Sequence, residues 1–260
     1  MSNITIAVAG KGGTGKTTLA ALLIRYLEEH TDGTILAVDG DPSSNLNIAL
    51  GLELDSTVGD IREEALLETR SGAYNPAMPK HDYFAYRIEE ALVEGDRVDL
   101  IAMGRPEGPG CYCAANNILR NVIDRLGDQY DYVVIDNEAG MEHISRQTTR
   151  HIDHLFITSD PTRRGLTAAA GIRRLVDQLS PHGTRVSHVH FVVNRVRGEL
   201  PPDFVEQAHA LGLPLVGTLP EDPLIGEFDL QGRPIIQLPG DSPLVHAVEA
   251  IAEKAGIRFP

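Results

Sequence analysis

Short runs of β-branched and other apolar residues recur along the chain, and between them apolar positions follow helical spacing. An apolar run predicts a buried strand, and apolar positions three or four residues apart predict an amphipathic helix. Strands that alternate with helices predict an α/β fold, with a mainly parallel sheet of about seven strands and helices on both faces. The predicted strands are 4–9, 35–38, 98–103, 132–135, 155–158, 188–193 and 215–219, and the clearest helices are 19–29, 114–126 and 165–179.

Residues 52–97 interrupt this alternation. Apolar groups at 52–54, 61–67 and 88–93 predict short helical fragments, and glycine and proline residues separate them. A length of 260 residues fits one large α/β domain. We therefore interpret 1–260 as a single α/β domain and 52–97 as an insertion specific to a narrower family.

A glycine-rich segment joins the first predicted strand to the first predicted helix. Glycines allow backbone N–H groups to turn towards an anion, and the helix N-terminus adds partial positive charge. Lys16 is placed to reach the outer phosphates of a nucleotide, and the Thr17 hydroxyl is placed to bind Mg²⁺. A glycine-rich turn without a ligand is the weaker alternative, because the whole phosphate-loop pattern is present. The segment is Gly10-Lys11-Gly12-Gly13-Thr14-Gly15-Lys16-Thr17-Thr18.

Carboxylates follow two of the predicted strands. Asp39 and Asp41 come after strand 35–38, and Asp136 comes after strand 132–135. Ligands of open α/β sheets bind outside the carboxyl ends of the strands, where carboxylates can hold Mg²⁺ or orient a water molecule. We predict that Asp39 and Asp136 act on Mg²⁺. Capping of the following helix, by Asp41 or Ser43 in the first loop and by Asp136 in the second, is the structural alternative.

The end of strand 188–193 indicates which nucleotide is bound. It continues as Asn194-Arg195-Val196-Arg197. Guanine-binding loops carry the pattern Asn-Lys-x-Asp, and Arg197 stands where the aspartate would be. The sequence therefore favours ATP over GTP.

The two cysteines of the chain, Cys111 and Cys113, lie in a glycine- and proline-rich stretch before a predicted helix. Two thiolates can chelate one soft metal, and a two-fold dimer would bring four thiolates to one axis. Zn²⁺ suits a tetrahedral set, Ni²⁺ a square-planar set, and a [4Fe–4S] cluster also takes four cysteines. Loop thiols without a ligand, or a redox pair, are the alternatives.

The composition and the start of the chain indicate which partners and which cellular location to expect. A net charge of −14 argues against binding to nucleic acid or to an anionic membrane, since both require cationic patches. We find no apolar run of about 18 residues that would predict a membrane span. A strand predicted from residue 4 leaves no room for a signal peptide, so we expect a cytoplasmic protein.

The second lysine of the glycine-rich segment, Lys11, makes it resemble the deviant Walker A motif of the MinD/ParA/nitrogenase-iron-protein ATPases. The resemblance implies a homodimer in which Lys11 reaches the nucleotide of the partner. It further implies that Asp41 positions the hydrolytic water and that Asn45 lies near the nucleotide. The residues that would border the adenine are Asn194, Pro220, Glu221 and Asp222.

Three further motifs narrow the resemblance to the CooC-type ATPases, which insert nickel into carbon monoxide dehydrogenase, and to their relatives for acetyl-CoA synthase. The motifs are Asp39-Gly40-Asp41-Pro42, Cys111-Tyr112-Cys113 and Gly140-Met141-Glu142-His143. The resemblance implies a Mg²⁺-dependent ATPase that holds Ni²⁺ or Zn²⁺ between the cysteine pairs of two subunits, with one of those enzymes as its client. An iron–sulfur scaffold or reductase ATPase and a MinD/ParA-like positioning ATPase are the alternatives.

Overall fold

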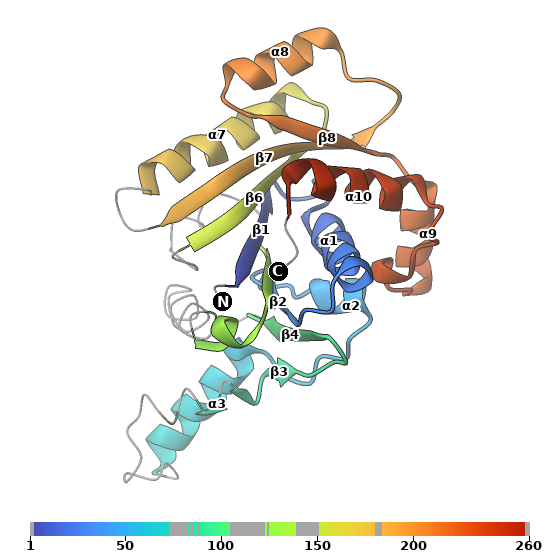
Figure 1. The fold of residues 1–260 in the computed structure, drawn as a ribbon. Helices are drawn as coiled ribbons and strands as arrows, with labels where there is room; N and C mark the ends of the chain where they lie inside the picture. The colour runs from blue at the N-terminus through green and yellow to red at the C-terminus, as the bar shows by residue number, and fades with distance from the viewer. Residues whose placement is uncertain are drawn as a thin grey trace.

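The computed structural model describes residues 3–72, 83, 86–87, 89–104, 123, 125–138, 151–179 and 184–257. In this part of the chain, one sheet of eight strands runs in the order β3-β4-β2-β5-β1-β6-β7-β8 (Figure 1). All neighbours are parallel except β3, which is antiparallel to β4. The strands are β1 (Ile4–Gly10), β2 (Ile35–Asp39), β3 (Leu92–Val93), β4 (Val98–Ala102), β5 (Tyr132–Asp136), β6 (His151–Ser159), β7 (Arg185–Val196) and β8 (Leu215–Pro220).

Helices cover both faces of the sheet. Figure 1 shows α7 and α8 on one face and α1, α2, α9 and α10 on the other, while α3 projects at one end. Alternate residues of the central strands point to the two faces, so Ile6 and Val8 of β1 join one core while Ala7 and Ala9 join the other. The helices are α1 (Lys16–His30), α2 (Leu46–Leu50), α3 (Val58–Ser71), α7 (Arg163–Leu179), α8 (Pro202–Ala210), α9 (Pro223–Gln231) and α10 (Pro243–Ala255), with short 3₁₀ helices η1 (Gly127–Gln129) and η3 (Ile235–Gln237).

The fold class predicted from the sequence is confirmed, and two details are corrected. The sheet has eight strands rather than about seven, because residues 92–93 form β3 where a helical fragment was expected. Residues 52–54 have no regular structure, whereas 61–67 lie within α3 as expected. A strand of two residues shows no periodicity, so only its pairing with β4 reveals it.

Histidines gather near the amino end of the strands, on the face that carries α1 and α10. His154 and His190 lie on neighbouring strands with His154 Nδ1 and His190 Nε2 3.0 Å apart. The rings of His154 and His188 also stack, with centroids 5.3 Å apart. His188 and His190 therefore share one face of β7.

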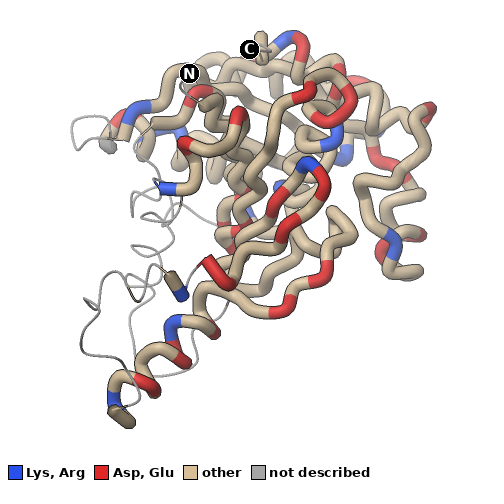
Figure 2. Tube along the Cα trace, turned by 60° about the horizontal axis from the view of Figure 1, so that its bottom comes forward, with Lys and Arg blue, Asp and Glu red and all other residues tan. Residues whose placement is uncertain are grey.

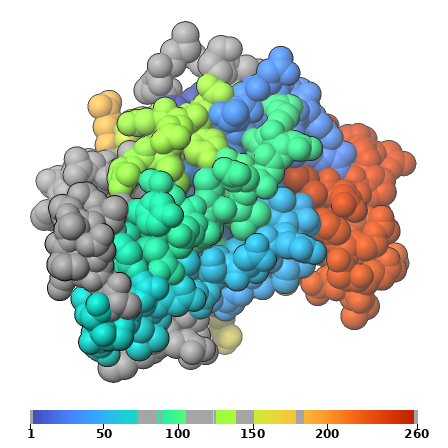
Figure 3. All heavy atoms as spheres, turned by 90° about the horizontal axis from the view of Figure 1, so that it is seen from below, coloured from blue at the N-terminus to red at the C-terminus, as the bar shows by residue number. Residues whose placement is uncertain are grey.

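Acidic and basic residues are interspersed over the part of the chain that the structure describes (Figure 2). Figure 2 shows acidic residues along most elements, with basic residues scattered among them. Seen from below in Figure 3, α3 lies at one edge and the C-terminal helices at the opposite edge. Within the described residues, no helix combines the length and apolar character that crossing a membrane would require.

Candidate nucleotide-binding site

The segment between β1 and α1 has the backbone conformation of an anion-binding loop. Gly13 and Gly15 adopt φ angles of 77° and 85°, a left-handed conformation that other residues rarely adopt. Gly15 is the N-cap of α1, and its side-chain-free backbone leaves the first N–H groups of the helix without a side-chain cap. The positive end of the helix dipole and these free donors favour a phosphate at this position.

Neighbouring strands hold this loop in place. Thr14 Oγ1 donates to Lys11 O at 2.7 Å and lies 2.8 Å from Thr158 Oγ1 at the end of β6. Asn194 Nδ2 in β7 donates to Thr14 O at 3.0 Å. A Cβ on Gly15 would come within 2.0 Å of Asn194 Nδ2, so this contact requires glycine. The loop is therefore positioned by the sheet before any ligand binds.

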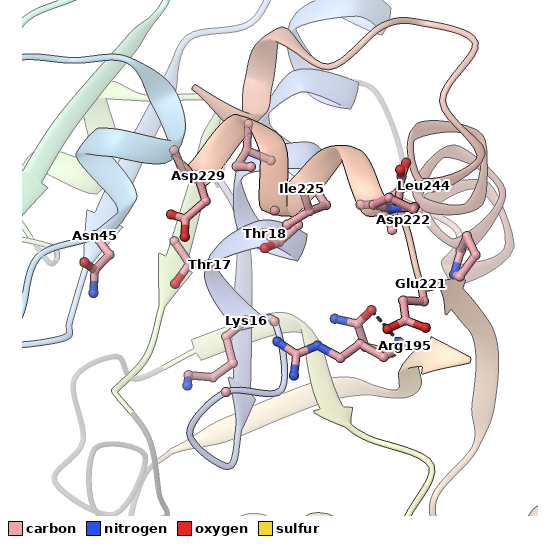
Figure 4. Close-up of a pocket in the computed structure, with 18 of the residues that line it drawn as sticks. Lys16, Thr17, Thr18, Asn45, Arg195, Glu221, Asp222, Ile225, Asp229 and Leu244 are labelled. Carbon is pink, nitrogen blue, oxygen red and sulfur yellow. Dashed lines mark hydrogen bonds between the residues drawn. The ribbon is translucent and has the colours of Figure 1, made fainter. Parts of the chain in front are cut away.

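A cavity of about 890 Å³ begins at this loop and extends over α1 towards the ends of β7 and β8. Figure 4 shows Lys16 and Thr17 towards one end and Glu221 towards the other, with Thr18 and Ile225 between them. A volume of this order is typical of small-molecule sites. Its lining combines the phosphate loop, the start of α2 with Asn45, the end of β7, the end of β8 and α9.

Thr17 connects the cavity to the end of β5. Its Oγ1 donates to Asp136 Oδ2 at 2.6 Å, while Asp136 Oδ1 is buried and has no hydrogen-bond partner among the described residues. A buried carboxylate oxygen without a partner is costly unless a cation or a water molecule occupies its other side. Thr17 and Asp136 supply hard oxygen ligands next to a phosphate loop, so the residues present fit Mg²⁺.

Burial also changes the acidity of this carboxyl group. Asp136 is 2% exposed, and desolvation raises its pKa from 3.8 to about 7. The hydrogen bond from Thr17 and the charge of Lys16 lower the pKa, while the charge of Asp39 raises it. A divalent cation at Asp136 would favour the ionised form and remove this penalty.

Asp39 lies beside Asp136 in the register of β2 and β5, but its oxygens are occupied. Asp39 Oδ1 accepts from Asp41 N at 3.0 Å, and Asp39 Oδ2 accepts from Leu46 N at 2.9 Å. Burial raises the pKa of Asp39, and these backbone donors lower it. Asp39 therefore organises the loop that leads into α2, and its predicted action on Mg²⁺ stays a prediction.

The loop after β2 also presents Asp41. Its Oδ1 accepts from Ser43 N at 2.9 Å. Asn45, at the N-terminus of α2, is exposed and lines the cavity. Lys11 is exposed at the start of the phosphate loop, as a lysine that reaches another molecule must be.

The predicted adenine-binding residues come together where β7 and β8 end. Asn194 is buried, and Arg195 after it adopts φ 57° with its N–H donating to Asn194 Oδ1 at 2.7 Å. Glu221 forms a bidentate ion pair with Arg197, and Asp222 caps α9 by accepting from Leu224 N at 2.9 Å. Pro220, Glu221 and Asp222 all line the cavity together with Asn194.

The sequence analysis did not identify two features of this site. Thr158 holds the phosphate loop through Thr14, and the ion pair between Arg197 and Glu221 closes one side of the cavity. A polar residue at the end of the predicted strand 155–158 was the available signal for Thr158. No local sequence pattern predicts that Arg197 pairs with Glu221, which lies 24 positions away.

Cys111 and Cys113 lie outside the residues that the structure describes, and so does Gly140. In the described ranges, no group of three or more histidine, cysteine, aspartate or glutamate residues is placed to hold a metal ion. The predicted nickel or zinc site thus stays a prediction.

The fold and the site together define a phosphate-loop nucleotide-binding protein. The sheet is mainly parallel, and a glycine-rich loop follows its central strand β1. A lysine and a threonine begin α1, and a carboxylate stands at the end of β5. The pattern of one such family, the CobQ/CobB/MinD/ParA nucleotide binding domain, matches residues 5–235. The chain belongs to this family and has the fold of its MinD/ParA-type ATPases.

Relatives of known sequence span almost the whole chain. An uncharacterized ATP-binding protein of Methanocaldococcus jannaschii is 45% identical over 249 residues, covering 96% of this chain and 97% of the relative. The carbon monoxide dehydrogenase accessory protein CooC of Rhodospirillum rubrum is 29% identical over 265 residues, with the same coverage of 96% and 97%.

Solved structures with a similar fold also cover almost the whole chain. The cell division ATPase MinD of Pyrococcus furiosus has a TM-score of 0.68 at 27% identity and covers 98% of both chains. The septum site-determining protein MinD of Pyrococcus horikoshii, complexed with Mg-ADP, has a TM-score of 0.69 at 25% identity and covers 98% of this chain and 96% of its own.

Proposed function

We propose that this protein is an ATP-hydrolysing homodimer that holds nickel and delivers it to carbon monoxide dehydrogenase or acetyl-CoA synthase. The observation that carries the ATPase part is the pair of Thr17 and Asp136 beside Lys16, with one buried Asp136 oxygen left without a partner. A nucleotide with Mg²⁺ would supply the charge that this arrangement lacks. The Mg-ADP held by a MinD of the same fold supports that ligand.

In the proposed reaction, water attacks the γ-phosphorus, and the bond from phosphorus to the bridging oxygen of ADP breaks. The backbone N–H groups of the phosphate loop and Lys16 bind the phosphates, and Thr17 and Asp136 hold Mg²⁺. When bound, the metal neutralises charge on the phosphate oxygens. Asp41 orients the water, and Lys11 reaches the nucleotide of the partner subunit across the dimer interface.

The nickel part of the proposal depends on Cys111 and Cys113, two cysteines separated by one residue. Four thiolates from two subunits would bind one soft divalent metal as cargo. The full-length similarity to CooC, at 29% identity, supports carbon monoxide dehydrogenase as the class of client.

Metal content and oligomeric state, measured together, test this proposal. The protein is purified anaerobically, incubated with Ni²⁺ or Zn²⁺, and run on size exclusion with elemental analysis, beside the double variant Cys111→Ser/Cys113→Ser. We expect about one Ni²⁺ per dimer for two cysteine pairs that form one site, and none in the variant. Equal nickel in both proteins would reject the cysteine site, and iron with sulfide would favour an iron–sulfur scaffold.

A second candidate is a positioning ATPase like MinD or ParA. The similarity to two MinD structures over nearly the whole chain favours it, while the net charge of −14 counts against binding to anionic lipid or DNA. ATP-dependent co-sedimentation with anionic vesicles or with DNA, without bound nickel, would favour this candidate over the metallochaperone.

A further inference from the structure

The two ends of the nucleotide cavity differ in how they can select a ligand. The phosphate loop binds phosphates and does not distinguish one base from another. Discrimination between ATP and GTP must come from the other end, where β7 and β8 finish. The last paired residues of these strands are Val196 and Pro220, so Arg197 and Glu221 follow side by side.

Arg197 and Glu221 form a complete bidentate ion pair at the wall of the cavity. Arg197 Nη2 donates to Glu221 Oε1 at 2.9 Å, and Arg197 Nε donates to Glu221 Oε2. Both residues line the cavity together with Asn194. Each oxygen of the Glu221 carboxylate is thus occupied by an arginine N–H group.

Stability is a poor explanation for this pair. The side chain of Arg197 is 82% exposed and that of Glu221 is 44% exposed, and ion pairs in water contribute little to folding. Strain is nevertheless built into the same strand end, because Arg195 is one of two described non-glycine residues with a left-handed backbone. Such strain is characteristic of positions that a functional site requires.

The chemistry of the two bases explains what an unpaired carboxylate would do here. Guanine presents two adjacent N–H donors on its Watson–Crick edge, while adenine presents one donor next to an acceptor nitrogen. A free carboxylate offers acceptors only, so it matches guanine and repels the acceptor of adenine. Arg197 occupies these acceptors and stands at the sequence position where guanine-binding loops carry their aspartate.

We propose that Arg197 determines the base specificity of this site by masking the Glu221 carboxylate, which would otherwise bind the guanine edge of GTP. The inference rests on the proposed use of ATP and deepens it. The hydrogen bonds from Arg197 also lower the pKa of Glu221, so the masked group is an ionised carboxylate at neutral pH.

Binding of fluorescent ATP and GTP analogues with Mg²⁺ tests the masking in wild type, Arg197→Ala, Glu221→Gln and the double variant. We expect wild type to prefer ATP by about tenfold or more, and Arg197→Ala to bind GTP about tenfold more tightly than wild type. Arg197→Ala/Glu221→Gln should lose that gain, and Glu221→Gln alone should show none. The exposure of both side chains predicts that the variants fold, which circular dichroism checks.

Arg173→Ala is the matched control, because Arg173 pairs with Asp177 on α7 and does not line this cavity. It removes the same charge and should leave the ratio of ATP to GTP affinity unchanged. An unchanged ratio in Arg197→Ala would overturn the inference, as would a GTP gain that persists in the double variant. If wild type binds no ATP, the proposed function itself fails, so the two failures are distinguishable.

Discussion

The ends of β2 and β5 carry the same residue type at the same register, yet the two sites differ. Asp39 and Asp136 are both buried, and they lie side by side in neighbouring parallel strands. Asp39 accepts hydrogen bonds from two backbone N–H groups, whereas Asp136 accepts one from Thr17 and keeps one oxygen without a described partner.

The difference between these two carboxylates lies in the loops that surround them. After Asp39 the chain folds back, so that the N–H groups of Asp41 and Leu46 meet its oxygens. Asp136 instead faces the first turn of α1 and the lysine of the phosphate loop. A saturated carboxylate stabilises a loop, and an unsaturated one next to a phosphate site is available to a cation.

Replacing Asp39 or Asp136 by asparagine tests this comparison, because asparagine preserves the shape of the side chain and removes its charge. The largest effect is expected at Asp136. Asp136→Asn should lower ATP hydrolysis by about 100-fold or more, because the cation loses its charged ligand. Steady-state phosphate release with Mg²⁺ measures this loss, and Asp32→Asn, at an exposed position between α1 and β2, is the control. Hydrolysis near the wild-type rate in Asp136→Asn would contradict the role of this carboxylate.

Thr17 should matter through its hydroxyl group. Thr17→Ala should reduce hydrolysis by about 10–100-fold, because both the donor to Asp136 and an oxygen ligand are lost. Thr17→Ser keeps the hydroxyl and should retain activity within a few-fold. Equal activity of the alanine and serine variants would show that the methyl group or the backbone, and not the hydroxyl, carries the effect.

Replacing Asp39 should lower the stability of the fold, whereas replacing Asp136 should lower the rate of ATP hydrolysis. Asp39→Asn places an NH₂ group against one of two backbone donors, which should lower the free energy of unfolding by about 1–3 kcal/mol. Urea denaturation compares this variant with Asp136→Asn, which should not be destabilised. A stable Asp39→Asn protein would remove the distinction between the two sites.

The smallest expected effect is a pH dependence of stability. The pKa of Asp136 is raised from 3.8 to about 7, so the folded state favours the protonated carboxyl. Stability from this group is present below its unfolded pKa and is lost as pH rises through the folded pKa.

Without Mg²⁺, the melting temperature of wild type relative to Asp136→Asn should therefore fall by about 2–4 °C between acidic and mildly alkaline pH. Differential scanning fluorimetry measures this difference, and added Mg²⁺ with nucleotide should reduce it. A difference that rises with pH would have the wrong sign for a raised pKa.

Much of this protein could be predicted from local patterns. The apolar runs located every described strand longer than two residues, and the glycine loop with its flanking strand and helix located the phosphate-loop end of the cavity. These signals are local because neighbouring residues determine backbone conformation and amphipathic spacing. The assignment to the MinD/ParA family followed from the same few residues and is confirmed by the match over residues 5–235, whereas the narrower CooC-type assignment stays a prediction.

The tertiary structure decided the rest. Pairing of strands places Asp39 beside Asp136, and the antiparallel β3 beside β4, although no local pattern specifies either neighbour. The ends of β7 and β8 likewise bring Arg197 to Glu221 across two strands. Sequence alone identified which groups carry charge, whereas only the packed sheet determined which of those charges are neutralised, because hydrogen-bond partners distant along the chain meet only when the strands pair.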